Sequence, residues 1–508
     1  MKGYILALCM TASLFAGAQN VGVGTATPDN SAMLDVNSSS KGMLLPRMTS
    51  LQRKAISNPA TGLLVFDTDK GSLMFFDGAS WRAMAFTDEN KSEPLARTPL
   101  QPIAGSGFGN SVAISGDYAI IGASKYGVGN IYQGTAYIFN RSANGWKEMA
   151  RLSAWDSAVS DYFGGSVAIS GDYAVVGAAN KKIGANSGQG KVYVYHRTGT
   201  SWLLDTAFTK PAGVAYDNFG YAVGVCAYNS GGIGITVGIP YSDVGGTNRG
   251  ELYCYRKTGS SWAFIQSLIP ADLAVSDSYG TTISMDTDYV AVAAPNQANA
   301  TYSVTNSGAV YIYAFGGGVW NFQQKIQGTT GQAKFGTALS LNSSTIAIGA
   351  PWGLVFTNTS PVVYIYKRTG ATWANTTSIY IYNTEIIPAA NQLTANGGGG
   401  LSIINTTFGL SLALSGNILI IGASGGLDFP NGGSSYYTDR NGTAYVFKAT
   451  ASGYFVKTNL IQSEYPFQGD GFGQSIGISG NQYIIGNPHV TVNGQSNTGN
   501  VYFGIESP

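Results

Sequence analysis

Few side chains in this sequence could carry out acid–base or nucleophilic chemistry. The chain of 508 residues has only two histidines, and no acid and nucleophile accompany His489 in sequence. His196 follows a predicted strand at a turn, which indicates a solvated residue, and His489 lies in a long loop. The sequence contains the residue types of a Ser-His-Asp triad, but no motif indicates one. No His/Cys cluster has the spacing of a metal site.

The acidic residues follow a regular pattern. Asp161, Asp217, Asp277 and Asp470 each stand two residues before an aromatic residue followed by glycine. This regularity favours turn capping over catalysis, although a carboxylate pair for glycoside hydrolysis stays open. The segment 286–288 (Asp-Thr-Asp) comes nearest to a calcium loop, but it lacks the glycine and the later acid of such loops. We therefore expect no cofactor and no calcium.

Composition narrows the classes of protein. Glycine is 69 of 508 residues, charged residues are only 11%, aromatic residues are 12%, and the net charge is +1. The low charge and the many aromatic residues argue against disorder. The absence of a basic excess argues against a nucleic-acid partner, because phosphate contacts need lysine and arginine.

An aromatic residue followed by glycine recurs seven times. The pairs are Phe108-Gly109, Phe163-Gly164, Phe219-Gly220, Tyr279-Gly280, Phe335-Gly336, Phe408-Gly409 and Phe472-Gly473. After each pair come an apolar run that usually ends in Gly-Ala, a loop of variable length, a tyrosine-centred run, and a turn that often precedes tryptophan. Each repeat thus predicts four short strands, here lettered A to D. Seven such repeats predict an all-β, seven-bladed β-propeller.

Residues 108–123 of the first repeat closely resemble the FG-GAP repeats of integrin α-like propellers. The resemblance extends over about residues 94–508 and implies the propeller of an exported bacterial protein. The last repeat stops after Tyr502 without a strand D. Residues 93–97 resemble strand D of the first repeat at 148–152, so we expect an N-terminal strand to close the ring and remove exposed edges.

The N-terminus indicates export. Residues 1–18 read as a signal peptide, with Lys2 before an apolar stretch and a small-residue cleavage site after Ala18, so we expect a secreted or cell-surface protein. No other run approaches the ~18 apolar residues of a membrane span.

Cys226 and Cys254 fall on the first and third strands of one predicted sheet. They should be ~9–10 Å apart, so we expect two free, buried thiols.

Residues 19–93 precede the repeats and predict a small β-module of short strands and a hairpin. The module resembles the leader module of exported Gram-negative envelope proteins and, loosely, a phage tail-fibre collar. The resemblance implies a tether or a homo-oligomerisation segment. A small appendage without a partner is the alternative.

The loops divide into a short set and a long set. The B–C and D–A loops share one rim of a propeller and are long here, and variable loops on a rigid scaffold commonly carry function. Five tryptophans open predicted strands D and should pack: Trp146, Trp202, Trp262, Trp320 and Trp373. The candidate ligand-binding residues are aromatics in the long loops: Trp155, Trp352, Tyr126, Tyr132, Tyr241, Tyr302, Phe356, Phe429, Tyr436 and Tyr437. Packing beneath their own loops is the alternative.

Together these features predict a non-enzymatic recognition or adhesion protein. Its expected partner is a glycan or an extracellular protein bound at the long-loop rim. A polysaccharide hydrolase or lyase acting at the same rim, and a structural envelope component assembled through residues 19–93, stay open as alternatives.

Overall fold

The computed structural model divides the chain into two compact units, residues 1–88 and residues 89–508. It describes residues 21–69, 72–83, 95–99, 103–127, 131–142, 145–352, 361–380, 407–424, 442–463, 470–492 and 494–506. The predicted signal peptide lies outside the described residues. In the part of the chain that the structure describes, no helix is long and apolar enough to span a membrane.

The first unit is a small β-module, as predicted. Strand β1 (Val21–Val23) pairs in parallel with β2 (Leu34–Val36). A second sheet has the order β3-β4-β5-β6, from β3 (Arg47–Met48), β4 (Leu64–Asp67), β5 (Ser72–Phe76) and β6 (Trp81–Ala83). The one helix described here, α1 (Ser50–Lys54), was not predicted, and a capping box between Thr49 and Gln52 starts it. It carries Arg53, which forms a buried ion pair with Asp67 at 2.8 Å.

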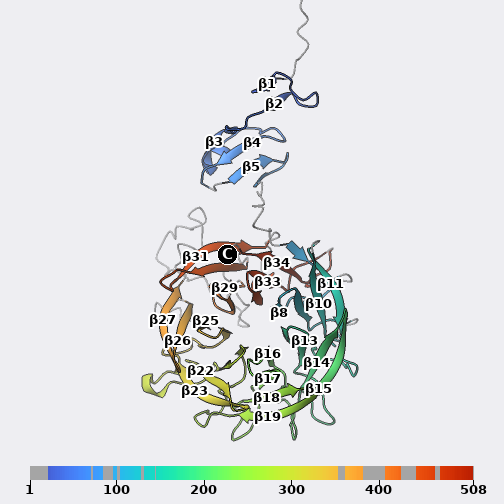
Figure 1. Ribbon diagram of the computed structural model, residues 1–508, viewed down its shortest axis with the longest axis vertical. Helices are drawn as coiled ribbons and strands as arrows, with labels where there is room; N and C mark the ends of the chain where they lie inside the picture. The colour runs from blue at the N-terminus through green and yellow to red at the C-terminus, as the bar shows by residue number, and fades with distance from the viewer. Residues whose placement is uncertain are drawn as a thin grey trace, which may run out of the picture. The chain divides into compact units, whose positions relative to one another are not determined.

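The second unit contains seven four-stranded antiparallel sheets, as the repeats predicted (Figure 1). The first three are β8 (Ser111–Ser115), β9 (Tyr118–Ala123), β10 (Thr135–Ser142) and β11 (Gly145–Leu152); β12 (Ser166–Ser170), β13 (Tyr173–Ala178), β14 (Lys191–Thr198) and β15 (Ser201–Phe208); and β16 (Ala222–Ala227), β17 (Ile233–Ile239), β18 (Glu251–Thr258) and β19 (Ser261–Leu268). The next three are β20 (Ile283–Met285), β21 (Tyr289–Ala294), β22 (Ala309–Gly316) and β23 (Val319–Gln327); β24 (Ala338–Leu341), β25 (Thr345–Ala350), β26 (Val362–Thr369) and β27 (Thr372–Tyr380); and β28 (Ser411–Ser415), β29 (Ile418–Ala423), β30 (Thr443–Ala449) and β31 (Phe455–Gln462). The sheets stand around a common centre, with the first strand of each sheet inside and the fourth outside (Figure 1).

The seventh sheet combines both ends of the unit. It has the order β32-β33-β34-β7, where β32 (Ile476–Ser479), β33 (Gln482–Asn487) and β34 (Asn500–Ile505) are C-terminal and β7 (Leu95–Arg97) precedes the first repeat. Strand β7 pairs antiparallel with β34, with Tyr502 opposite Ala96. The strand missing from the last repeat is therefore supplied from residues 95–97, as the sequence predicted.

The repeated aromatic-glycine pair forms the contact between neighbouring sheets. All seven aromatic residues of the pairs are buried, and Phe163, for example, meets Tyr193 of its own sheet edge-to-face at 5.3 Å. The adjoining backbones approach so closely that a Cβ at Gly122 would lie 2.1 Å from the carbonyl oxygen of Gly164 in the next sheet. The same approach brings Gly486 of the seventh sheet against Gly109 of the first. Glycine is required at these positions because any side chain would collide with the neighbouring backbone.

The two cysteines of the second unit are free and buried, as predicted. Cys226 lies on β16 and Cys254 on β18, the first and third strands of one sheet, with β17 between them.

Candidate recognition surface on the long loops

The antiparallel order of each sheet places the B–C and D–A loops at the same end. We call this end the long-loop rim. Its described loops in the first four sheets are 124–127, 131–134, 179–190, 240–250 and 295–308 between strands B and C, and 153–165, 209–221, 269–282 and 328–337 between strands D and A. The A–B connections at the opposite end are as short as two residues, at 116–117 and 171–172.

A repeated backbone ladder fixes five of the D–A loops, within the described residues, against the B–C loop of the preceding sheet. The amides of Tyr216, Asn218 and Phe219 donate to the carbonyl oxygens of Ser187, Gly188 and Gln189 at 2.9–3.0 Å. The same three bonds recur at the following two junctions, and again where Gly105, Gly107 and Phe108 meet residues 496–498 of the last sheet. The long loops are therefore tied into the scaffold by hydrogen bonds to neighbouring sheets.

The ladder places two left-handed residues in each of these five D–A loops. They lie three residues and one residue before the aromatic: Gly105 and Gly107, Ser160 and Tyr162, Tyr216 and Asn218, Ser276 and Ser278, and Gln332 and Lys334. The first loop uses glycine, for which positive φ is free of strain, whereas the next four use residues that adopt it at a cost. Such strained positions are frequent at functional sites.

Large apolar side chains project from this rim into solvent. Trp155 is 73% exposed, Tyr216 68% and Tyr302 59%. Further exposed apolar residues of the same loops are Val159, Val214, Tyr221, Tyr241, Val244 and Val275. They come from consecutive D–A and B–C loops, so neighbouring sheets contribute to one end of the unit.

Trp155 stands beside a set of polar groups that are partly buried. The ammonium of Lys191 lies 5.1 Å from the centre of the indole and forms an ion pair with Asp156 at 2.9 Å. The Tyr193 hydroxyl donates to the same carboxylate at 2.5 Å. Burial raises the pKa of Asp156, but the Tyr193 and Lys191 hydrogen bonds and the Lys181 charge outweigh it and lower the pKa. An aromatic face therefore adjoins a carboxylate that stays charged at neutral pH.

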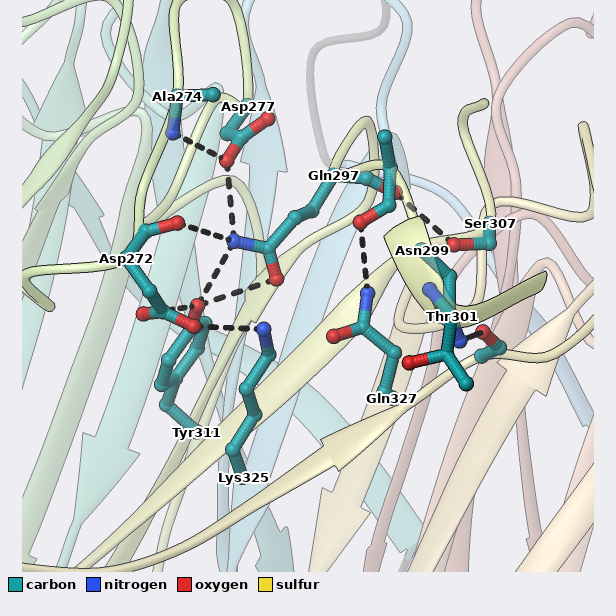
Figure 2. Close-up of polar contacts among 12 residues, drawn as sticks. Asp272, Ala274, Asp277, Gln297, Asn299, Thr301, Ser307, Tyr311, Lys325 and Gln327 are labelled. Carbon is teal, nitrogen blue, oxygen red and sulfur yellow. Dashed lines mark hydrogen bonds and ion pairs between the residues drawn. The ribbon is translucent and has the colours of Figure 1, made fainter. Parts of the chain in front are cut away.

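The fourth sheet builds an equivalent polar group (Figure 2). Tyr311 donates to Asp272 at 2.9 Å, and Lys325 forms an ion pair with the other oxygen of Asp272 at 2.7 Å. The amide nitrogen of Gln297 donates to Asp277 at 3.1 Å and to the carbonyl of Asp272 at 3.2 Å. Gln297 thus links two acids of one D–A loop to the B–C loop.

In the third sheet, a lysine of the D–A loop lies beside the buried aspartate, where the fourth sheet has Gln297 of the B–C loop. Lys210 contacts Asp217 at 3.4 Å and Glu251 at 3.2 Å, and it donates to Ser242 at 2.7 Å. All four side chains are buried. Their role is structural, because a bound substrate would not reach groups so fully covered.

The predicted aromatic residues divide into two groups. Trp155, Tyr302 and Tyr241 are exposed on the long-loop rim. The others described are partly buried: Trp352; Tyr126, whose ring lies 4.0 Å from the Arg151 guanidinium; and Tyr132, which stacks on Tyr162 at 5.8 Å. Phe356, Phe429, Tyr436 and Tyr437, and almost all of the insertion 382–407, lie outside the described residues.

The regular aspartates cap loop backbones, as predicted. Asp161, Asp217 and Asp277 each accept the amide of the residue three positions earlier, at 2.6–2.8 Å. Asp470 differs, because its Oδ1 accepts the amide of Phe472 two positions later. Among the residues that the structure describes, no group of three or more His, Cys, Asp and Glu side chains is placed to hold a metal ion.

The predicted position of one histidine was wrong. His196 lies within β14 rather than at the turn after it, opposite Tyr173 in register, and the two rings stack at 4.5 Å. The strand continues through His196 to Thr198, because the following turn begins only at Gly199. His489 lies on the long-loop rim next to Asp470, whose carbonyl accepts its amide at 2.9 Å.

Sequence reasoning missed Tyr216 and the buried lysines Lys181 and Lys210. One signal could have indicated Tyr216. It stands three residues before Phe219, and the equivalent positions of the two flanking repeats are Ser160 and Ser276, so a large aromatic residue replaces serine there. No comparable signal marked the lysines, because Lys181 comes from a B–C loop and Lys210 from a D–A loop.

Comparison with known families agrees with this architecture. The FG-GAP repeat model matches residues 102–139, 146–195 and 262–313, and the model named phage tail like trimerisation region matches residues 22–94. The chain thus carries FG-GAP repeats within residues 102–313 and a phage-tail-like trimerisation region before them. No curated protein gives a significant match.

Proposed function

We propose that this chain is an exported, non-enzymatic recognition protein that binds a glycan through the long-loop rim. The observation that carries the proposal is Trp155, which is 73% exposed beside the ion pair of Lys191 and Asp156. A flat aromatic face next to groups that bind hydroxyls suits a sugar ring, which has both an apolar face and a polar edge. An extracellular protein partner is the broader form of the same proposal.

The state of the carboxylates supports binding rather than hydrolysis. Asp272 is held by Tyr311 and Lys325, and Asp217 and Glu251 contact Lys210. Glycoside hydrolysis needs one acid that can donate a proton and a second that can act as base or nucleophile. Burial raises the pKa of Asp272, but the hydrogen bonds from Lys325 and Tyr311 outweigh it and lower the pKa, so this carboxylate is a poor proton donor at neutral pH.

We further propose that residues 22–94 assemble the chain into a homotrimer. The family match to a trimerisation region supports this. So does the surface of β1 and β2, where Val21, Val23, Leu34 and Val36 are 43–55% exposed. Val21 lies opposite Leu34 and Val23 opposite Val36, so two apolar pairs lie exposed on one small parallel sheet.

The binding proposal is tested with a glycan and matrix-protein array probed with residues 19–508, in calcium and in chelator. A positive glycan is then titrated against Trp155→Ala and against Phe322→Ala. Phe322 is a matched control because it is 58% exposed on the outer strand β23, away from the long loops. We expect Trp155→Ala to weaken binding about tenfold or more and Phe322→Ala to leave it unchanged. Equal binding by both variants would reject the rim assignment.

The oligomer is tested by light scattering of residues 19–508. We expect three times the chain mass, and a lower mass for Val23→Asp, because a charge in a buried apolar contact is costly. A wild-type monomer would reject the trimer without affecting the binding proposal.

A further inference from the structure

Among the described residues, the rim of the seventh sheet lacks the lysine or glutamine donor that the second, third and fourth sheets possess. A backbone bond identifies the corresponding position in each sheet. The amide of the glycine before strand C donates to the carbonyl of Lys181 in the second sheet, Ser242 in the third, Gln297 in the fourth and Val490 in the seventh, at 2.9–3.2 Å. These four residues are therefore structurally equivalent.

In the second, third and fourth sheets the buried aspartate of the D–A loop meets a nitrogen donor of the chain. Lys181 contacts Asp161 at 2.8 Å, and Gln297 donates to Asp277 at 3.1 Å. In the third sheet Ser242 is too short, and Lys210 approaches Asp217 instead, at 3.4 Å. Two of the three donors are ammonium groups that neutralise the carboxylate.

The seventh sheet keeps the aspartate, but apolar Val490 replaces the donor. Asp470 is 2% exposed and Val490 is 3% exposed. The Oδ1 atom of Asp470 accepts the amide of Phe472 at 3.0 Å, while its Oδ2 atom has no hydrogen-bond partner. A buried carboxylate oxygen without a donor or a cation is costly.

Two further buried oxygens at the same end of the sheet are also without partners. They are Oδ1 of Asn487 and Oδ1 of Asn500, whose residues lie opposite each other on β33 and β34. Both residues are at most 5% exposed. In the second sheet this pair is Ala178 and Lys191, so the two amide oxygens are particular to the seventh sheet.

Asp470 and Asn487 belong to one polar group with Ser463. The Asn487 amide nitrogen donates to the Ser463 hydroxyl at 3.4 Å, and that hydroxyl lies 3.1 Å from Tyr502 Oη. Burial raises the pKa of Asp470, and the amides of Phe472 and Gly442 with the Ser463 and Asn487 side chains only partly offset it. The group is rich in oxygen atoms, and Asp470 is its one acid among the residues that the structure describes.

We propose that the seventh sheet binds a monovalent alkali cation, Na⁺ or K⁺, between Asp470 and the amide oxygens of Asn487 and Asn500. The ion takes the role of the Lys181 ammonium in the second sheet. Carboxylate, amide and hydroxyl oxygens are the ligands of hard cations. A single carboxylate balances one positive charge, which favours a monovalent over a divalent ion.

The test is thermal unfolding of residues 19–508 at constant ionic strength, with choline chloride replaced by NaCl, KCl or CaCl₂. Binding to the folded state alone raises Tm, by about 3 °C for a unit of this size at a hundredfold excess over Kd. We expect Na⁺ or K⁺ to give this shift in the wild type. Asp470→Asn should abolish it.

Val490→Lys provides a variant that should restore the donor of the second sheet. We expect it to lose the cation response and to be as stable in choline as the wild type is in the preferred cation. Asp277→Asn, in the fourth sheet, is the matched control and should keep the response. Equal Tm in choline and in all three salts, or a response retained in Asp470→Asn, would overturn the site. A response to Ca²⁺ alone would overturn the assignment of a monovalent ion.

Discussion

The indole of Trp146 stacks on the ring of Phe503, with 4.4 Å between the centroids and 14° between the planes. Trp146 lies on the fourth strand of the first sheet and Phe503 on the third strand of the last. The other strand-D tryptophans also contact the preceding sheet, as Trp202 contacts Tyr118 and Trp373 contacts Tyr289. The stack of Trp146 thus links sheets whose sequences are far apart.

Trp146→Ala should destabilise the second unit by about 3–5 kcal/mol, because it removes a large buried side chain at a junction of sheets. Denaturant unfolding monitored by circular dichroism measures the change. Trp155→Ala, at an exposed position, should cost less than about 1 kcal/mol. Similar losses in the two variants would show that the Trp146 stack adds nothing specific.

Deletion of residues 94–104 should lower Tm by many degrees and promote aggregation. The deletion removes β7 and leaves β34 as an unpaired edge strand. Differential scanning calorimetry and light scattering measure the two effects. A shorter deletion within residues 19–83 leaves β7 intact and should preserve the transition of the second unit. An unchanged transition after deletion of 94–104 would contradict the role of β7.

The repeats made the scaffold predictable, because each repeat encodes the same strands, turns and close glycine contacts. The glycine at position 122 could be predicted from the sequence. The close approach of two backbones that requires it recurs between neighbouring sheets, so the same glycine recurs in the repeats. The position of strand β7 was also readable, because residues 93–97 resemble a strand D that the last repeat lacks.

The side-chain partners at the rim could not be predicted in the same way. Lys181 and Lys210 occupy related spaces but come from different loops, so alignment of the repeats does not pair them. The sequence also could not predict which aromatic side chains of the loops are exposed. Tyr126 and Trp155 are both loop aromatics, yet Arg151 covers one while the other remains open to solvent.

Lys181→Met should reduce the unfolding free energy by about 3–5 kcal/mol. The variant removes the ammonium that neutralises the buried carboxylate of Asp161 and that also donates to the Asp156 carbonyl. Urea unfolding at pH 7 measures the loss. The adjacent Lys182 is exposed, so Lys182→Met is the matched control and should change stability by less than about 0.5 kcal/mol. Equal effects of the two substitutions would contradict the structural role of Lys181.

The thiols of Cys226 and Cys254 should be unreactive in the folded protein. Burial raises the pKa of both, which reduces the reactive thiolate, and β17 separates their strands. With residues 19–508, a chromogenic thiol reagent should react with neither cysteine under native conditions and with both in denaturant. Fast reaction of either thiol in the native protein would contradict its burial, and a missing thiol after denaturation would indicate a disulfide.

The pH dependence of stability should report the buried carboxyl of Asp277. Burial raises its pKa above the ordinary 3.8, although the Ala274 amide and Gln297 partly offset this. Between 3.8 and the raised value the folded state binds more protons than the unfolded state. The stabilisation associated with Asp277 is therefore present at low pH and lost as pH rises through this window. Asp277→Asn removes the titration, so the difference in unfolding free energy between wild type and variant should shift against the wild type as pH rises. Urea unfolding at several pH values measures the difference, and a difference that does not change with pH would contradict the raised pKa.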